Sequence, residues 1–344
     1  MHPKRPSTFV RYTVLATLLV VLGGVCLAQT EPATFHFVSF APKGAQGTYP
    51  GSIDSAGQVA GFYLNSASVL HGFLRKAGGI IVSVDPPGSV GTVARASNPA
   101  GVVSGYYGDA SGHYHGFVRD SNGHYVSFDA ASGSTLTIPL AMNPQGRIAG
   151  LYNDAKQATH GFLRTVAGTV VSFDACHGTD TIATSINSAG QIAGYYSDSS
   201  HLQHGFLRGI HGACRSFDPP GSIKTLPTAM NDAGAIVGFY LDASQVQHGF
   251  LRKPCGTYFN IDPPGSGSTN VTGIAPDGTA VGYYSRGTAD QHGFLRKPDG
   301  TFISFDAPGA PDTVPLGINK AGQVVGNENS HNGVYRGFLF SIVP

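Results

Sequence analysis

The chain has 344 residues, with 21 Lys and Arg against 20 Asp and Glu, and its formal net charge is +1 at pH 7. This balance argues against nucleic acid as a partner, because binding to nucleic acid requires a basic surface. Only 12% of the residues are charged and 48 are Gly, but 41% are hydrophobic and occur in short periodic runs, which indicates a folded protein.

The first 28 residues have the pattern of a secretory signal peptide. Lys4, Arg5 and Arg11 precede an apolar run of 15 residues that ends in Cys-Leu-Ala. This run is shorter than the roughly 20 residues that a membrane-spanning helix needs. We therefore expect a secreted, periplasmic or cell-surface protein with no stable membrane insertion after cleavage. The alternative is an uncleaved anchor.

Residues 29–344 are expected to form a single repeat domain. A first strand is expected over 35–42, and after it one unit of sequence recurs with a spacing of 44 or 45 residues. The units begin near Thr48, Thr92, Thr137, Thr181, Thr225, Thr269 and Thr313. They account for nearly the whole domain and leave no room for a second one.

Each unit divides into four short strands. In the unit from Thr181 these are "TIATSI", "QIAGYY", "HGFLR" and "CRSFD", bounded by Asn, Asp, Gly or Pro. Such short bounded runs are typical of strands, and no window has the length of a helical pattern. Four antiparallel strands in a unit of this length are typical of a β-propeller blade.

The two ends of the domain complement each other. The last unit has three expected strands, over 314–318, 323–326 and 335–340, while 35–42 aligns without a gap with the fourth strand over 301–308. We therefore predict an all-β fold, a seven-bladed β-propeller of four-stranded antiparallel blades, closed by the N-terminal strand that completes the last blade. The alternative is a linear β-solenoid, which would leave strand edges open.

The repeat resembles a known family. The pattern Ile-Asn-x-x-Gly-x-x-x-Gly-Tyr followed by His-Gly-Phe-Leu is similar to the bacterial extracellular HAF repeat, named for a His-Ala-Phe core. Here the core reads His204-Gly205-Phe206 and its equivalents, and the match covers all seven units. The resemblance implies a secreted, propeller-like protein. It implies no defined activity and no catalytic residues.

The recurring residues within the repeat receive structural interpretations first. Equivalent positions in a propeller lie on a wide ring, so the repeated His cannot ligate one ion, and we expect each to bond within its blade to residues of the Ser127 or Asp129 type. We expect the Arg of the Arg75 type to be solvated on an exposed rim. The Gly of the Gly61 type is attributed to close approach of the neighbouring blade.

Three cysteines follow the predicted cleavage site, at Cys176, Cys214 and Cys255. Three thiols cannot all pair within one chain, so disulfides do not define the fold. A bridge between Cys214 and Cys255, in neighbouring repeats, is one hypothesis.

One face of the expected propeller carries tyrosines at the ends of second strands and Asp in the loops that follow. The structural interpretation is that Asp caps turns. The functional interpretation is a binding face, because Tyr rings and carboxylate acceptors suit sugar hydroxyls or a calcium ion. We expect no cofactor and no metal site, with calcium as the alternative. The candidate ligand-binding residues are Tyr107, Asp109, Tyr152, Asp154, Tyr196, Asp198, Tyr240 and Asp242.

We expect a monomeric binding or scaffold module for an extracellular glycan or protein, multivalent through its repeated loops. The alternative is a propeller hydrolase or lyase with a single site at the mouth of the central channel. Its catalytic candidates break the repeat: Glu328 and His331 in the last unit, and Arg95 on an innermost strand. The chain contains no G-x-S-x-G, no H-E-x-x-H and no Gly-rich phosphate loop, so we favour the binding module.

Overall fold

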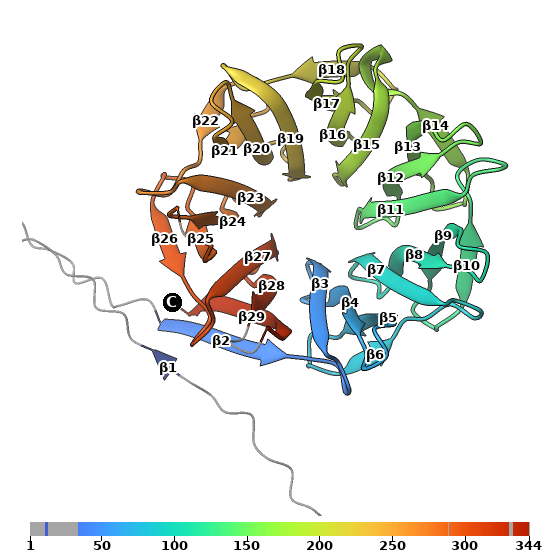
Figure 1. Cartoon of the computed structure of the whole chain (residues 1–344), viewed down its shortest axis with the longest axis horizontal. Helices are drawn as coiled ribbons and strands as arrows, with labels where there is room; N and C mark the ends of the chain where they lie inside the picture. The colour runs from blue at the N-terminus through green and yellow to red at the C-terminus, as the bar shows by residue number, and fades with distance from the viewer. Residues whose placement is uncertain (1–10, 13–33, 288, 330–332, 344) are drawn as a thin grey trace, which may run out of the picture.

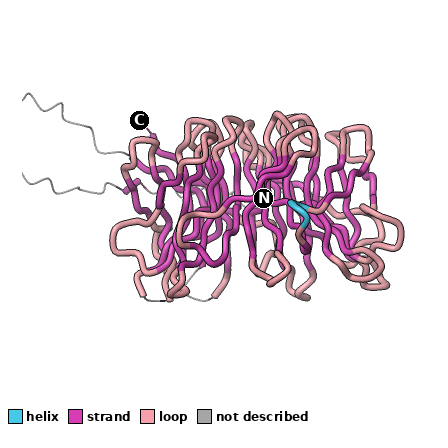
Figure 2. The backbone as a smooth tube through the Cα atoms, turned by 90° about the horizontal axis from the view of Figure 1, so that it is seen from above, coloured by secondary structure: helices cyan, strands magenta, loops and turns pink. Residues whose placement is uncertain are grey.

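The computed structural model describes residues 11–12, 34–287, 289–329 and 333–343. Over these residues the protein is an all-β propeller, in which strands surround a central axis (Figure 1) and loops cover both flat faces (Figure 2). Apart from Arg11 and Tyr12, the predicted signal peptide lies outside the described residues.

Each repeat forms an antiparallel meander that starts at the central axis and runs outward. The innermost strands are β3 (Gly47–Ile53), β7 (Gly91–Ser97), β11 (Leu136–Met142), β15 (Thr179–Ile186), β19 (Ser222–Met230), β23 (Ser268–Ile274) and β27 (Asp312–Ile318). The second strands are β4 (Val59–Leu64), β8 (Val103–Gly108), β12 (Ile148–Asn153), β16 (Ile192–Ser197), β20 (Ile236–Asp242), β24 (Ala280–Ser285) and β28 (Val324–Asn329). The third strands are β5 (Leu70–Arg75), β9 (Tyr114–Arg119), β13 (Thr159–Arg164), β17 (Gln203–Arg208), β21 (Gln247–Arg252), β25 (His292–Arg296) and β29 (Tyr335–Val343). The outer strands are β6 (Ile81–Ser83), β10 (Tyr125–Phe128), β14 (Val170–Phe173), β18 (Cys214–Phe217), β22 (Tyr258–Asn260), β26 (Phe302–Phe305) and, from the other end of the chain, β2 (Thr34–Phe40).

The prediction of seven separate four-stranded antiparallel blades is wrong. The described strands form six hydrogen-bonded sheets, and five of these are single blades: four built from one repeat each, and the closing sheet, which joins the last repeat to the N-terminal strand. The sixth sheet has eight strands, because β11 pairs in parallel with β9 at Leu136 and Tyr114. The closing sheet has five strands, because β1 (Arg11–Tyr12) pairs with β2. Backbone hydrogen bonds thus join two successive repeats that the sequence pattern predicts to be separate blades.

The N-terminal strand closes the ring, as predicted. β2 pairs antiparallel with β29 along its whole length. The ungapped alignment is wrong by one residue, however, because Phe40 lies opposite Gly337 as Phe305 lies opposite Gly293. An alanine therefore follows Phe40 where the other repeats carry an Asp of the Asp306 type.

A β-bulge in every innermost strand explains the glycine that recurs in the second strand. In β3 the pairing shifts between Pro50 and Ser52. A Cβ on Gly61 would lie 2.6 Å from the carbonyl oxygen of Tyr49 and 2.7 Å from the ring of Phe73, both in the same repeat. The prediction that a neighbouring blade excludes a side chain here is wrong, because the bulged backbone and the buried Phe of the same repeat fill the space.

Side-chain hydrogen bonds connect neighbouring repeats at the innermost strands. Thr228 lies at a bulge, and its Oγ1 donates to the carbonyl of Val271 in the next repeat at 2.6 Å. At the following turn, Nδ2 of Asn319 donates to the carbonyl of Asp54 at 3.1 Å and connects the last repeat to the first. These bonds satisfy backbone carbonyls that the bulges and turns leave without a strand partner.

The repeated Arg side chains also connect repeats. Arg75 and Arg164 are each only 8% exposed, so the prediction of a solvated Arg rim is wrong. The guanidinium of Arg164 lies 4.9 Å from the ring centroid of Phe128, in the preceding repeat. Arg75 lies 5.1 Å from the ring of Phe40, so the same cation–π contact joins the first repeat to the closing strand.

A disulfide connects Cys176 to Cys214, 38 residues further along and in the next repeat. The hypothesis of a Cys214–Cys255 bridge is therefore wrong, and Cys255 is a free, exposed thiol. Cys176 lies in the short 3-10 helix η1 (Ala175–His177), where Cys176 and His177 have positive φ angles of 50° and 63°. The disulfide anchors a turn that residues other than Gly rarely adopt.

We expect Phe40→Ala to lower the free energy of unfolding by about 3 kcal/mol, because it removes a buried ring from the ring closure. Phe40 is 8% exposed and packs edge-on against Phe73 at 6.1 Å. Phe259→Ala is the control, because Phe259 is 36% exposed and should cost less than about 1 kcal/mol. Urea denaturation followed by intrinsic fluorescence measures both, and equal losses would contradict the role given to Phe40.

We expect Cys214→Ser to lower the free energy of unfolding by about 2–4 kcal/mol, because a closed loop of this length restricts the unfolded chain. Cys255→Ser should leave the stability unchanged. Denaturation with and without a reducing agent provides the check, since the reductant should destabilise the wild type and the Cys255 variant but not the Cys214 variant.

Candidate functional site

A repeated cluster of His, Asp and Tyr occupies one face of the propeller. In each of four successive repeats the His at the start of the third strand lies between two Asp, one in the loop after the second strand and one after the outer strand. The Nδ1 atom lies 2.6–2.8 Å from the outer Asp, and the Nε2 atom lies 3.3–3.6 Å from the loop Asp. The four His and their loop and outer Asp are His115 with Asp109 and Asp129, His160 with Asp154 and Asp174, His204 with Asp198 and Asp218, and His248 with Asp242 and Asp262. The prediction that each His bonds within its repeat is confirmed.

These contacts shift the pKa values of both partners. Burial opposes protonation of His115, but hydrogen bonds to Asp129 and Asp109 outweigh burial and raise the pKa of the ring. The backbone N–H of His113, with further bonds from His115 and Ser111, lowers the pKa of Asp109 to about 2. The same directions hold for His160 with Asp154, His204 with Asp198 and His248 with Asp242. A protonated ring donates from both nitrogens, so in its protonated form each ring can donate to both of its carboxylates.

The structure gives every predicted ligand-binding residue a partner within its own repeat. The loop Asp cap turns: one Asp109 oxygen accepts the N–H groups of Ser111 and His113, and the other accepts Ser111 Oγ and faces His115. Asp154, Asp198 and Asp242 cap their loops in the same way. The tyrosines stack on the His rings at 5.2–5.6 Å between centroids, in the pairs Tyr107–His115, Tyr152–His160, Tyr196–His204 and Tyr240–His248.

Two outer Asp that were not among the candidates have an exposed free acceptor, whereas a third, Asp218, has an unpartnered Oδ1 that is buried. One oxygen each of Asp129 and Asp174 meets the Nδ1 of its His, and among the described residues nothing bonds the second oxygen. Their side chains are 41% and 48% exposed. Their recurrence before the turns is visible in the sequence, but only the contacts show that the loop Asp are saturated and these two are not.

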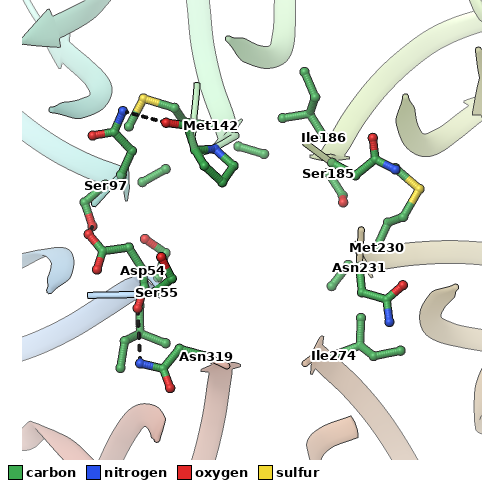
Figure 3. A pocket seen from close by; sticks show the side chains of 18 of the residues that line it. Asp54, Ser55, Ser97, Met142, Ser185, Ile186, Met230, Asn231, Ile274 and Asn319 are labelled. Atoms are coloured by element: carbon green, nitrogen blue, oxygen red, sulfur yellow. Dashed lines mark hydrogen bonds between the residues drawn. The ribbon is translucent and has the colours of Figure 1, made fainter. Parts of the chain in front are cut away.

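The innermost strands enclose a central cavity of about 570 Å³ (Figure 3). Arg95 lines it, half-buried, and burial lowers the pKa of its guanidinium. Asp54 also lines the cavity, but its carboxylate already accepts bonds from the N–H groups of Ala56 and Gln58, from the Gln58 amide and from Ser97 Oγ. Both oxygens of Asp54 therefore already have partners within the fold.

Of the residues of the hydrolase or lyase alternative, the two that the structure describes, Glu328 and Arg95, are not brought together. Glu328 is 7% exposed, does not line the central cavity, and accepts a hydrogen bond from Ser39 Oγ at 2.5 Å. Burial raises its pKa, against the opposing effects of Ser39 and Arg336. Glu328 stands where other repeats have the Tyr, and Arg336 stands where they have the His, so the closing repeat replaces one internal network with another. His331 lies outside the described residues.

Within the described residues, no helix is long and apolar enough to span a membrane. In the same part of the chain, no three His, Cys, Asp or Glu are grouped in a way that would hold a metal ion.

Comparison with solved structures shows the fold and not the activity. The β-propeller domain of the Trilobed protease from Pyrococcus furiosus is 10% identical, with 85% of this chain and 95% of that chain covered and a TM-score of 0.57. The BP39L lectin from Burkholderia pseudomallei is 9% identical, with 86% and 96% covered and a TM-score of 0.51. A puromycin hydrolase mutant complexed with PGG is 12% identical, with 85% and 52% covered and a TM-score of 0.57. No family model and no curated protein sequence matches the chain.

We expect the protein to be most stable between pH 3.8 and 6.5, the ordinary pKa values of Asp and His. The His pKa values are raised in the fold, so their stabilisation is complete below pH 6.5 and is lost as the pH rises through the folded values. The loop Asp pKa values are lowered, so their stabilisation is present above pH 3.8 and is lost as the pH falls through the folded values. The urea midpoint measured against pH tests this expectation.

The variant His204→Gln should reduce the loss of stability on the alkaline side, because one of the titrating rings is removed. His211→Gln is the control, since His211 is exposed and bonds to no described carboxylate. A stability that rises steadily from pH 5 to pH 8 would contradict the assignment.

Proposed function

We propose that this protein is a secreted, multivalent binding module whose His–Asp face holds extracellular glycans. The observation that carries the proposal is the free carboxylate oxygen of Asp129 and Asp174, exposed at equivalent positions of neighbouring repeats and held in place by a His ring. A fixed acceptor beside a polar ring suits the hydroxyl donors of a sugar. Equivalent weak sites on one rigid face would act together on a branched or polymeric ligand.

The charge of the clusters favours a neutral glycan. Each cluster holds two carboxylates and one His, so it stays negative even when the ring is protonated. An acidic ligand would therefore be repelled. We propose that these sites work without a resident cation, because the His ring already occupies the position between the two carboxylates.

Export is part of this proposal, and two features support it. The N-terminal pattern is that of a signal peptide. The Cys176–Cys214 disulfide is a bond that persists in oxidising compartments. Membership of the HAF-repeat proteins, which the sequence resembles, is proposed with it.

We expect the mature chain to bind neutral oligosaccharides on a glycan array and to show several equivalent weak sites in titration calorimetry. Asp174→Asn should lower the number of sites by one and leave the affinity of the others unchanged, because the amide oxygen still accepts from His160 but the charged acceptor is lost.

Asp120→Asn is the matched control. Asp120 is likewise a carboxylate that contacts a His Nδ1, that of His124 at 3.0 Å, but it caps a turn and lies at the other end of β9. The proposal fails if no glycan is retained, if a protein partner is bound instead, or if the two variants behave alike.

A further inference from the structure

A second cavity, of about 660 Å³, lies between β26 and the closing sheet, at the junction that we call the seam. Its lining includes Phe37, Phe305, Phe340, Arg286, His292 and Asp306. The volume is within the range of about 300–1,000 Å³ that small-molecule sites occupy. One cavity is therefore lined by a guanidinium, an imidazole, a carboxylate and several aromatic rings.

The seam is where the repeat changes its charges. Arg286 stands where four other repeats carry the loop Asp, so the Nε2 atom of His292 meets no carboxylate among the described residues. His292 still bonds through Nδ1 to both oxygens of Asp306, each at 3.1 Å. The cluster of this repeat is thus missing one carboxylate and has gained one cation at the same place.

Arg286 is held in position by a buried ring. Its Nη2 donates to the hydroxyl of Tyr284 at 2.9 Å, and its Cζ lies 5.4 Å from the centroid of that ring. Tyr284 is 2% exposed, and its hydroxyl lies 3.1 Å from Ser304 Oγ. The side chain of Arg286 is otherwise exposed, so its remaining N–H groups are available to a ligand.

The opposite wall of the cavity is apolar. Phe340 stands where other repeats carry the Arg of the Arg164 type, and it stacks parallel to Phe305 with centroids 4.1 Å apart. Phe37 of β2 lies 6.5 Å from Phe340 and extends the wall. At four other junctions between repeats a guanidinium covers the equivalent ring, whereas here an aromatic surface faces the cavity.

We propose that the seam cavity binds a carboxylate-bearing hydroxylated ring, of which a hexuronic acid is the simplest member. The ligand carboxylate takes the place of the missing Asp, between Nε2 of His292 and the guanidinium of Arg286. The apolar face of the sugar ring packs on the Phe wall, and its hydroxyls donate to Asp306. A wholly apolar acid would leave the Asp306 carboxylate, half exposed in the free protein, desolvated without a donor.

This inference goes beyond the proposed function and does not depend on it. The His–Asp face is repeated and negative, whereas the seam is a single site with a cation. A neutral glycan that fails to bind leaves the seam untested, and a uronate that fails to bind leaves the repeated face untested, so the two failures are distinguishable.

Titration calorimetry of the full mature chain with glucuronate should show one site, and methyl glucoside should bind roughly tenfold more weakly or not at all, because it lacks the charge-assisted hydrogen bonds. Arg286→Gln should weaken glucuronate binding by about the same factor. Arg215→Gln is the control, because it removes an equally exposed cation from another repeat.

Arg286→Asp is a second variant, and it should remain folded. It restores beside His292 the loop Asp of the other repeats, so the new carboxylate has a partner. It should abolish glucuronate binding while the thermal midpoint stays equal or rises. A glucuronate-terminated disaccharide that binds more tightly than free glucuronate would assign the site to glycan ends, and the reverse order would assign it to the free acid; both support the proposal.

The proposal is overturned if methyl glucoside binds as tightly as glucuronate, or if Arg286→Gln has no effect. It is overturned as well if acetate binds as tightly as glucuronate, since the aromatic wall would then contribute nothing. An amino acid that binds more tightly than glucuronate would assign the cavity to an ammonium-bearing ligand and would also reject it.

Discussion

The pairing of β2 with β29 is the constraint on which the remaining structure depends. It brings the two ends of the domain together, so that the innermost strands enclose a cavity and the last repeat faces the first. The strand also supplies side chains to three places at once: Phe40 under the guanidinium of Arg75, Ser39 to the buried Glu328, and Phe37 to the seam. An outer strand supplied by the last repeat itself would have the sequence of the other outer strands and would not supply these three side chains.

The repeated polar residues mainly stabilise the fold. Only the polar atoms that have no partner within the protein remain for a ligand. His, Tyr and the loop Asp of each cluster satisfy one another, as buried or half-buried polar groups must. In four repeats the Arg of the third strand likewise packs on an aromatic ring of the preceding repeat or, for Arg75, of the closing strand. In the binding module that we propose, the contacts to a ligand would therefore come from the second oxygens of Asp129 and Asp174, and not from the residues that recur most visibly.

Two breaks in the repeat have opposite consequences. In the closing repeat, Glu328 and Arg336 replace Tyr and His, but Ser39 supplies a partner and the carboxyl is buried. In the repeat before it, Arg286 replaces Asp, and among the residues that the structure describes no carboxylate contacts the guanidinium of Arg286 or the Nε2 atom of His292. Glu328 is the residue that stands out in the sequence because Glu is rare, but its carboxyl group already has a hydrogen-bond partner within the fold. Arg286 could have been found by aligning the repeats column by column, but only the cavity beside it shows that its change is not compensated.

The sequence by itself determined the all-β class, the number and length of the repeats and the closure by the N-terminal strand, because strand periodicity, turn residues and a missing strand are local signals. It also indicated the bonding of each His within its repeat. Only the tertiary structure decided which repeats share a sheet, that Cys176 and not Cys255 meets Cys214, and that Gly61 faces a bulge of its own repeat. These outcomes depend on distances between residues that are far apart in the chain. Every copy of the 44-residue repeat has the same local sequence pattern, whereas the residues that it contacts in the neighbouring repeats differ.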